Sequence, residues 1–178
     1  MRPPRKRLLV VDGYNVLNAW RPSLDSTSLA DSREELARRL LDYAGFSGQE
    51  VILVFDAWMS DRMQRTEETT GPLTVVYTQK NETADHYIER LCDSRSRDVE
   101  YGRLEIRVAT SDNVEQMVIL GRGATRLSSR ELLYEMDNVR REGRAGAVPP
   151  KSSTRTPVMD RLSDDVRRRL EDLLKGQK

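Results

Sequence analysis

Three aspartates in this chain follow closely on predicted strands, and together they could bind a cation. Asp12 follows the apolar run LLVV, Asp56 follows the apolar run VILVF, and Asp112 comes two residues after the predicted strand 105–110. Asp followed by Gly, as at position 12, is also ordinary turn chemistry after a strand. In a parallel sheet, however, all strands end at the same edge, where open α/β sheets bind their ligands. We therefore expect the three carboxylates to converge.

Two further acids stand at the start of a predicted helix over 82–93. Glu82 and Asp85 are three residues apart, which places them on neighbouring positions of one helix face. Acids in a first helical turn are also favoured by the helix dipole, and this explanation stays open for Glu82. For Asp85 we favour a functional explanation, because Ala84 and Ile88 should hold its helix against the sheet.

Clustered carboxylates need something that offsets their repulsion. Two of them about 5 Å apart repel by roughly 3 kcal/mol at an effective dielectric of 20. Protonation, Arg or Lys partners, or a bound cation would offset this, and oxygen ligands alone favour Mg²⁺ or Mn²⁺. Such a metal activates water and orients a phosphate, which predicts phosphodiester chemistry. The predicted metal ligands are Asp12, Asp85 and Asp112, with Asp56 bound through water or in the outer shell, and the catalytic set adds Asn15 and Glu82.

Other chemistries fit less well. An aspartyl phosphatase would carry a second Asp two residues after the first, but position 14 is Tyr. Gly121-Arg-Gly123 is only a fragment of a dinucleotide fingerprint, so we expect no dinucleotide cofactor. His86 is better explained as a surface or outer-shell residue, and Cys92 as core packing.

The apolar runs alternate with helical patterns, which predicts an α/β fold with a mainly parallel sheet of four to five strands and helices on both faces. We expect the segment 61–71 to be a loop or lid. Ser128 and Glu131 are spaced as a capping box. The predicted strands are 7–12, 50–56, 74–78, 105–110 and a short 124–127, and the predicted helices are 31–43, 82–93, 115–120 and 128–142.

The charge of this 178-residue chain is unevenly distributed. The net charge is +1, but residues 1–138 have an acidic excess of four and residues 139–178 a basic excess of five. We expect a domain over 1–143, then a linker and a basic helix (160–174) within 144–178. A basic tail fits a polyanion partner, although solvated helix faces would explain it equally well.

Several side chains are candidates for RNA contact. Tyr14, Trp20 and Trp58 could stack on bases or pack in the core. Lys80 and Asn81 could meet a phosphate or simply form a turn. The other candidates are Ser111, Arg140, Arg141, Arg144, Lys151, Arg167, Arg168 and Arg169.

The chain contains one cysteine, which excludes an internal disulfide framework and a cysteine-rich zinc site. No stretch approaches the roughly 20 apolar residues that cross a bilayer. We therefore expect a cytoplasmic protein without a membrane partner.

Four motifs occur in order: VDGYNVL (11–17), VFD (54–56), ETAD (82–85) and ATSDN (109–113). Over residues 7–142 the chain resembles the YacP-type NYN domains, relatives of the PIN-domain nucleases. The resemblance implies a PIN-like, Rossmann-like three-layer fold and a divalent-metal ribonuclease. The subfamily includes a bacterial endoribonuclease that associates with the ribosome and cuts translated mRNA in the A site, which implies mRNA and the ribosome as partners.

Two alternatives to a nuclease remain. The fold could bind RNA or the ribosome without cutting, although such a binder gains nothing from carboxylates that face phosphate. A hydrolase of nucleotides or small phosphoesters would share the acidic site but would not need the basic tail.

Overall fold

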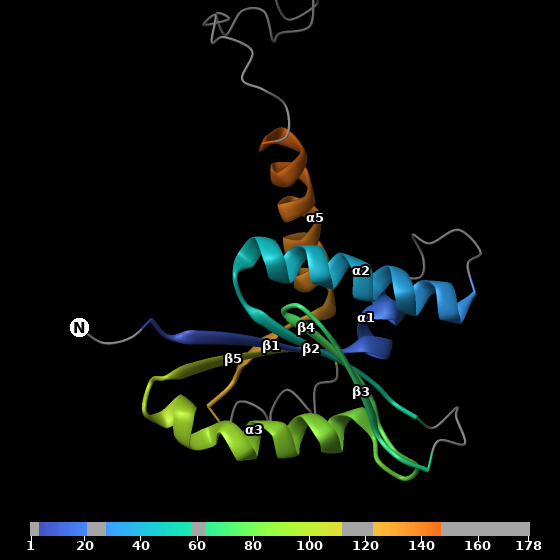
Figure 1. Cartoon of the computed structure of the whole chain (residues 1–178), viewed down its shortest axis with the longest axis vertical. Helices are drawn as coiled ribbons and strands as arrows, with labels where there is room; N and C mark the ends of the chain where they lie inside the picture. The colour runs from blue at the N-terminus through green and yellow to red at the C-terminus, as the bar shows by residue number, and fades with distance from the viewer. Residues whose placement is uncertain (1–3, 21–27, 58–62, 112–122, 147–178) are drawn as a thin grey trace, which may run out of the picture. The chain divides into compact units, whose positions relative to one another are not determined.

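A computed structural model describes residues 4–20, 28–57, 63–111 and 123–146, with side chains through residue 143. These residues form an α/β fold (Figure 1). In chain order the elements are β1 (Lys6–Asp12), α1 (Gly13–Trp20), α2 (Leu29–Ser47), β2 (Glu50–Phe55), β3 (Thr66–Thr70), β4 (Leu73–Tyr77), α3 (Ala84–Glu100), β5 (Leu104–Ala109), β6 (Thr125–Leu127) and α5 (Ser129–Gly146).

The six strands form one sheet in the order β3-β4-β2-β1-β5-β6. All neighbouring pairs are parallel except β3 with β4. Within the parallel part, the chain moves outward from β1 to β2 and β4 and then returns to add β5 on the other side of β1. In α/β sheets, the carboxyl edge beside such a reversal is where ligands bind.

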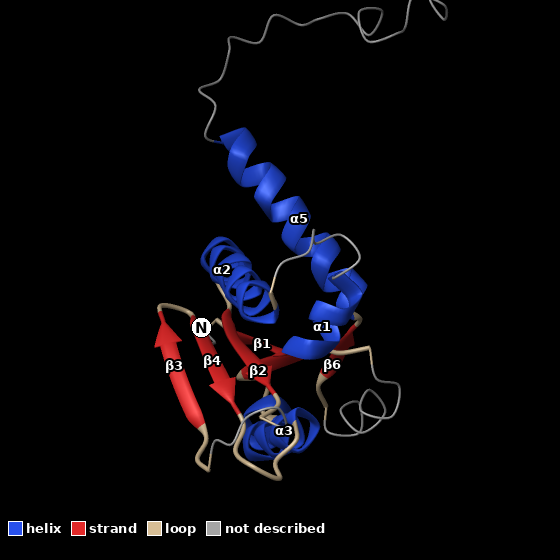
Figure 2. Ribbon diagram, turned by 90° about the vertical axis from the view of Figure 1, so that its right-hand side faces the viewer, coloured by secondary structure: helices blue, strands red, loops and turns tan. Residues whose placement is uncertain are grey.

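Helices cover both faces of the sheet, α1, α2 and α5 on one face and α3 on the other (Figures 1 and 2). The alternation of side chains along β1 explains this arrangement. Leu9 and Val11 pack in the core beneath α1, α2 and α5, whereas Leu8 and Val10 pack in the core beneath α3. Because both faces are buried here, residues 8–11 of the strand are all apolar.

Short polar side chains cap the starts of the long helices. Ser28 Oγ accepts a hydrogen bond from the Asp31 amide (3.1 Å) at the start of α2, and Gly48 ends that helix with a φ of 63°. The capping box predicted before α5 is confirmed. Glu131 accepts from the Ser128 amide (2.7 Å), and Ser128 Oγ accepts from the Glu131 amide (3.2 Å).

The chain divides after Ala145 into two units, and all described residues except Gly146 belong to the first, Met1–Ala145. The helix expected over 115–120 lies outside the described residues. The linker and basic helix expected within 144–178 also lie outside them, except for residues 144–146, which belong to the last turn of α5. Among the described helices, none has the length and apolar character needed to span a membrane.

The structure corrects the expected loop or lid at 61–71. Residues Thr66–Thr70 form β3, an edge strand that pairs antiparallel with β4 and gives the sheet six strands. Its side chains are mostly exposed, so it carries none of the apolar alternation that marks a half-buried strand. Residues 66–70 form a strand because they pair with β4.

Two helix starts also differ from expectation. The turn expected after Asp12 is the start of α1, which buries Val16, Leu17 and Trp20. The helix expected from Glu82 begins at Ala84, because Thr83 is its cap and accepts from the His86 amide (3.2 Å). Glu82 therefore precedes α3.

Candidate functional site at the carboxyl edge of the sheet

Asp12 lies at the carboxyl end of the central strand and is only 6% exposed. It continues the alternation of Leu8 and Val10 toward the α3 side of the sheet. It also caps α1, since its Oδ1 accepts a hydrogen bond from the Asn15 amide (3.1 Å). The Asn15 side chain donates to Oδ2 (3.1 Å), so one residue orients both carboxylate oxygens.

Gly13 makes this close approach possible. A Cβ at position 13 would lie 2.4 Å from the Phe55 ring and 2.9 Å from the Val54 carbonyl oxygen. The start of α1 can therefore pack tightly onto the end of β2 only without a side chain. The carboxyl ends of β1 and β2 are drawn together at this point.

Asp56 follows β2 directly and lies near Asp12. Its negative charge contributes to raising the pKa of Asp12, and its Oδ2 accepts a hydrogen bond from the Ala84 amide (3.3 Å) at the start of α3. The positive end of the helix dipole thus points at Asp56. Asp85, the next residue of α3, is half-buried. The chain brings Asp12, Asp56 and the first turn of α3 to one edge.

The buried Thr78 hydroxyl holds this edge together. Thr78 Oγ1 accepts from the Ala57 amide (2.9 Å) and donates to the Glu82 carbonyl (2.8 Å). It ties the end of β2 to the turn before α3. No feature of the sequence pointed to this residue, because a single Thr after a strand carries no pattern.

Burial raises the pKa of the Asp12 carboxyl, and the neighbouring Asp56 raises it further, while the hydrogen bonds from Asn15 lower it. The net direction is upward. The charged form of Asp12 is therefore poorly solvated and repelled by a neighbouring carboxylate. A bound cation would relieve both effects.

Glu82 has different partners. It is 6% exposed, and its carboxylate accepts from Arg65 Nε (3.2 Å), forms ion pairs with Arg65 and Arg90, and accepts from the Gln79 amide (3.3 Å). Its charge is offset by two guanidinium groups. Sequence reasoning missed both arginines, because Arg65 lies in a polar segment and Arg90 eight residues along the chain.

The remaining predicted contacts are dispersed. Lys80 and Ser111 are exposed near the carboxyl edge, and Asn81 has a φ of 66°, a backbone conformation that Asn tolerates in turns. Arg140 and Arg141 are exposed late in α5, about 16 Å along the helix from its start. The structure describes no side chain for the predicted residues Asp112, Arg144, Lys151, Arg167, Arg168 and Arg169.

Two aromatic candidates for base stacking pack within the protein. The ring centroid of Tyr14 lies 5.3 Å from that of Phe55 in an edge-to-face arrangement. Trp20 is 7% exposed, with the Arg39 guanidinium carbon 4.5 Å from its ring centroid. Trp58 lies outside the described residues.

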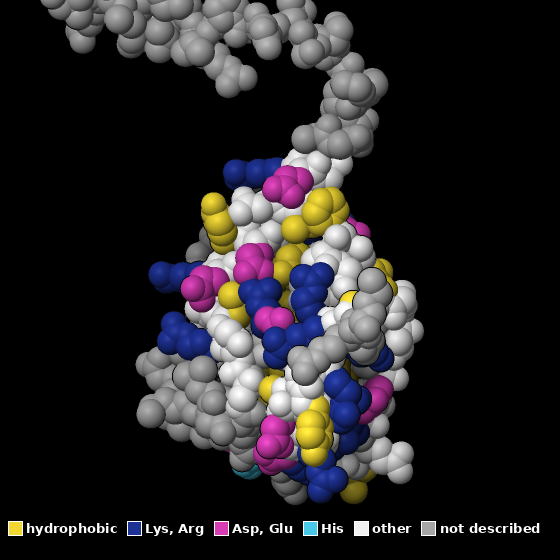
Figure 3. Space-filling model, turned by 90° about the vertical axis from the view of Figure 1, so that its left-hand side faces the viewer, with side chains coloured by type: hydrophobic (Ala, Val, Ile, Leu, Met, Phe, Trp, Pro, Cys, Tyr) yellow, Lys and Arg dark blue, Asp and Glu magenta, His cyan; other side chains and the backbone are white. Residues whose placement is uncertain are grey.

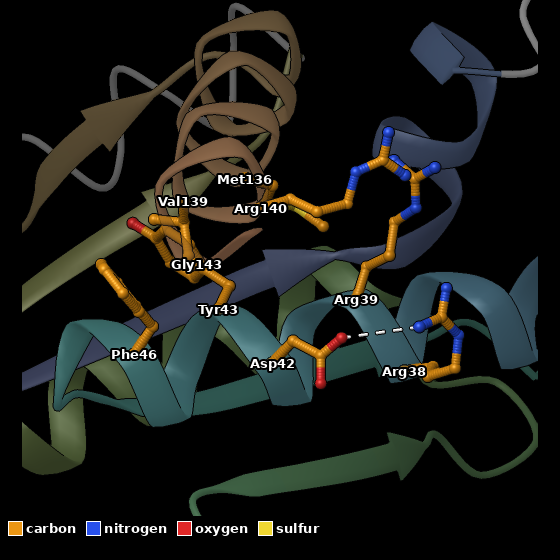
Figure 4. A pocket seen from close by; sticks show the side chains of 9 residues that line it. All are labelled: Arg38, Arg39, Asp42, Tyr43, Phe46, Met136, Val139, Arg140 and Gly143. Atoms are coloured by element: carbon orange, nitrogen blue, oxygen red, sulfur yellow. Dashed lines mark hydrogen bonds and ion pairs between the residues drawn. The ribbon is translucent and has the colours of Figure 1, made fainter. Parts of the chain in front are cut away.

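A hollow of about 230 Å³ between α2 and α5 is separate from the strand ends (Figure 4). Arg140 lines it, together with Arg38 and Arg39. Arg38 forms ion pairs with Glu35 and Asp42, and Arg39 forms ion pairs with Glu35 and Asp137. The charges of Arg38 and Arg39 are thus offset locally. The hollow is not part of the acidic site.

The atoms that could bind a metal ion at the carboxyl edge are carboxylate oxygens. In the part of the chain that the structure describes, no three His, Cys, Asp or Glu side chains form a metal-binding group; Asp112 lies outside that part. The pair of Asp12 and Asp56 fits a hard divalent cation by its ligand type and by the closeness of two negative charges. It does not fit zinc, which favours Cys and His.

The strand order, the two-sided helical cover and the acids at the carboxyl edge define a PIN-like α/β fold. A family model of the YacP-like NYN domain matches residues 9–175, and the chain belongs to this family. YacP of Bacillus subtilis (strain 168) is 38% identical over 136 residues, which span 75% of this chain and 77% of that protein.

Solved structures agree with this assignment. A mutant of Rae1 (YacP) from Bacillus subtilis is 33% identical, with a TM-score of 0.65 and coverage of 94% of this chain and 99% of that one. A second crystal structure of Rae1 (YacP) is 31% identical, with a TM-score of 0.64 and coverage of 96% and 85%.

Proposed function

We propose that this chain is a cytoplasmic, divalent-metal-dependent endoribonuclease that cuts mRNA on the translating ribosome, in the A site. The observation that carries the proposal is the pair of Asp12 and Asp56 at the carboxyl edge. Asp12 is buried, is oriented by Asn15 and is repelled by the nearby charge of Asp56. Membership of the NYN family supports a nuclease, and the resemblance to YacP-type proteins suggests the ribosome.

In this proposal Asp12, Asp56, Asp85 and Asp112 hold Mg²⁺ or Mn²⁺. When bound, the ion supplies an activated water and offsets charge on the phosphate. Asn15 fixes both Asp12 carboxylate oxygens through its backbone and side-chain N–H groups, and would so keep them in place to hold the ion. Asp56 is fixed by the Ala84 amide. Glu82 acts indirectly, by holding Arg65 and Arg90 beside this edge.

Cationic and polar side chains would bind the RNA strand. Lys80 and Ser111 are exposed close to the acidic edge and suit the phosphates flanking the cut. The candidates for contacts further along the strand are Arg140, Arg141, Arg144 and Arg168.

Cleavage mapping on actively translating ribosomes tests the proposal. Wild type should produce defined cuts, whereas Asp12→Asn and Asp85→Asn should reduce cutting at least a hundredfold while still binding ribosomes. Asp31→Asn, an exposed acid in the first turn of α2, is the matched control and should cut normally.

The outcomes separate the candidate functions. Full activity in Asp12→Asn would contradict the assignment of the site. Ribosome binding without cleavage by the wild type, with or without added Mn²⁺, would favour the RNA-binding module over the nuclease.

A further inference from the structure

A hollow of about 540 Å³ lies at the opposite, amino edge of the sheet. Leu8, Ile52 and Leu104 line it with apolar side chains, and the last turns of α3 form one wall. Leu8 lies on the same face of β1 as Asp12, but near the other end of a strand about 20 Å long. The volume of the hollow is typical of a small-molecule site. This amino-edge hollow is therefore distinct from the acidic site.

Cations surround the amino-edge hollow. Lys6 and Arg95 line it, and within the described part of the chain neither has an ion-pair partner. Arg103 also lines it, but its charge is offset by Asp98 (Nε to Oδ1, 2.9 Å). Glu50 contributes one negative charge, which leaves one net positive charge. Figure 3 looks at this edge and shows Lys and Arg side chains, interspersed with Asp and Glu, beside apolar ones.

An exposed aromatic ring completes the lining. Tyr101 follows α3 and is 68% exposed, far more than the aromatic side chains of the core. The guanidinium carbon of Arg103 lies 4.9 Å from its ring centroid. A planar ring backed by a guanidinium is a good stacking surface for a nucleobase, worth roughly 1–3 kcal/mol per base.

We propose that the amino-edge hollow binds a nucleotide, with the base against Tyr101 and the apolar floor and the phosphate on Arg95 and Lys6. Arg suits this task because its planar fork binds phosphate through two hydrogen bonds. The nucleotide can be free or part of an RNA strand, since both present the same base and phosphate. Nothing in this proposal requires nuclease activity at the other edge.

The test is a titration of the full chain with adenosine monophosphate and with a short oligoadenylate, in EDTA so that no divalent ion recruits phosphate to the acidic edge. Amide NMR signals of Tyr101 and Gly102 report occupancy of the hollow. We expect saturable shifts at these residues. Arg95→Gln should raise the Kd about tenfold and Tyr101→Ala at least fivefold.

Arg97→Gln is the matched control, because Arg97 is exposed on the same helix and does not line the hollow. It should leave the Kd within twofold. Saturation by the monophosphate supports a site for free nucleotides, and saturation by the oligoadenylate alone supports a site for an RNA strand. Absence of saturable shifts with both ligands, or equal weakening in Arg97→Gln and Arg95→Gln, would overturn the proposal.

Discussion

Two buried acids at the carboxyl edge, Asp12 and Glu82, have equal exposure but opposite electrostatic surroundings. Glu82 is paired with Arg65 and Arg90, whereas Asp12 has an amide partner and a nearby carboxylate. Removal of the charge should therefore change stability in opposite directions.

Asp12→Asn should raise the thermal unfolding midpoint in EDTA at neutral pH. The pKa of Asp12 is raised in the folded protein, so its contribution to stability is greatest below the unfolded pKa and is lost as the pH rises through the folded pKa. Asparagine still caps α1. The difference from wild type should shrink toward pH 4. Calorimetry from pH 4 to 8 measures this, and a variant less stable than wild type at pH 7 would contradict it.

Glu82→Gln should instead lower the free energy of unfolding by about 1–3 kcal/mol, since two guanidinium groups lose their charged acceptor. Partial exposure of Arg65 and Arg90 keeps the effect below that of a fully buried pair. Urea unfolding at pH 7 measures the loss. Glu34→Gln, which removes the charge of an exposed glutamate of α2, provides the comparison.

At the scale of elements, the junction of β1 and α1 is the tightest constraint on the site. Gly13→Ala should destabilise by about 1–3 kcal/mol, because the added methyl group meets the Phe55 ring and the Val54 carbonyl. Gly45→Ala within α2 is the matched control. It meets no atom within 4 Å and should stabilise by about 0.5–1 kcal/mol. Equal effects in urea unfolding would remove the packing argument.

The buried elements were the ones that could be predicted from sequence. β1 and β2 contain continuous apolar runs, β5 alternates apolar with charged residues, and the shared direction of the three strands followed from the intervening helices. β3 could not be predicted, because an exposed edge strand with the sequence TEETT has no pattern of its own. α1 was missed because Asp12-Gly13 serves equally well as a turn and as a helix cap.

The candidate site divides in the same way. That Asp12 and Asp56 meet followed from strand ends sharing an edge. The arginines of Glu82 could not be predicted, since their approach depends on how β3 and α3 are placed in space. The metal ligands themselves remain predictions.

At the scale of the molecule, residues up to Ala145 form a unit of their own. A chain that ends at Gly146 should keep the circular dichroism and cooperative urea unfolding expected of the described helices and strands. Truncation after 143 would cut α5, so Gly146 is the better end point. A non-cooperative transition would contradict this autonomy. Unchanged cutting on ribosomes would show that the basic tail is dispensable for docking.

The central position of β1 has a consequence for synthesis of the protein. β1 is made before both of its partners, because β2 begins at residue 50 and β5 at residue 104. Parallel pairing over such separations is slow, because a long loop must close before any contact forms. The pairing of β1 on both of its sides is therefore complete only after residue 109 has been made. A nascent copy would lack the assembled acidic edge while its own message is still being read.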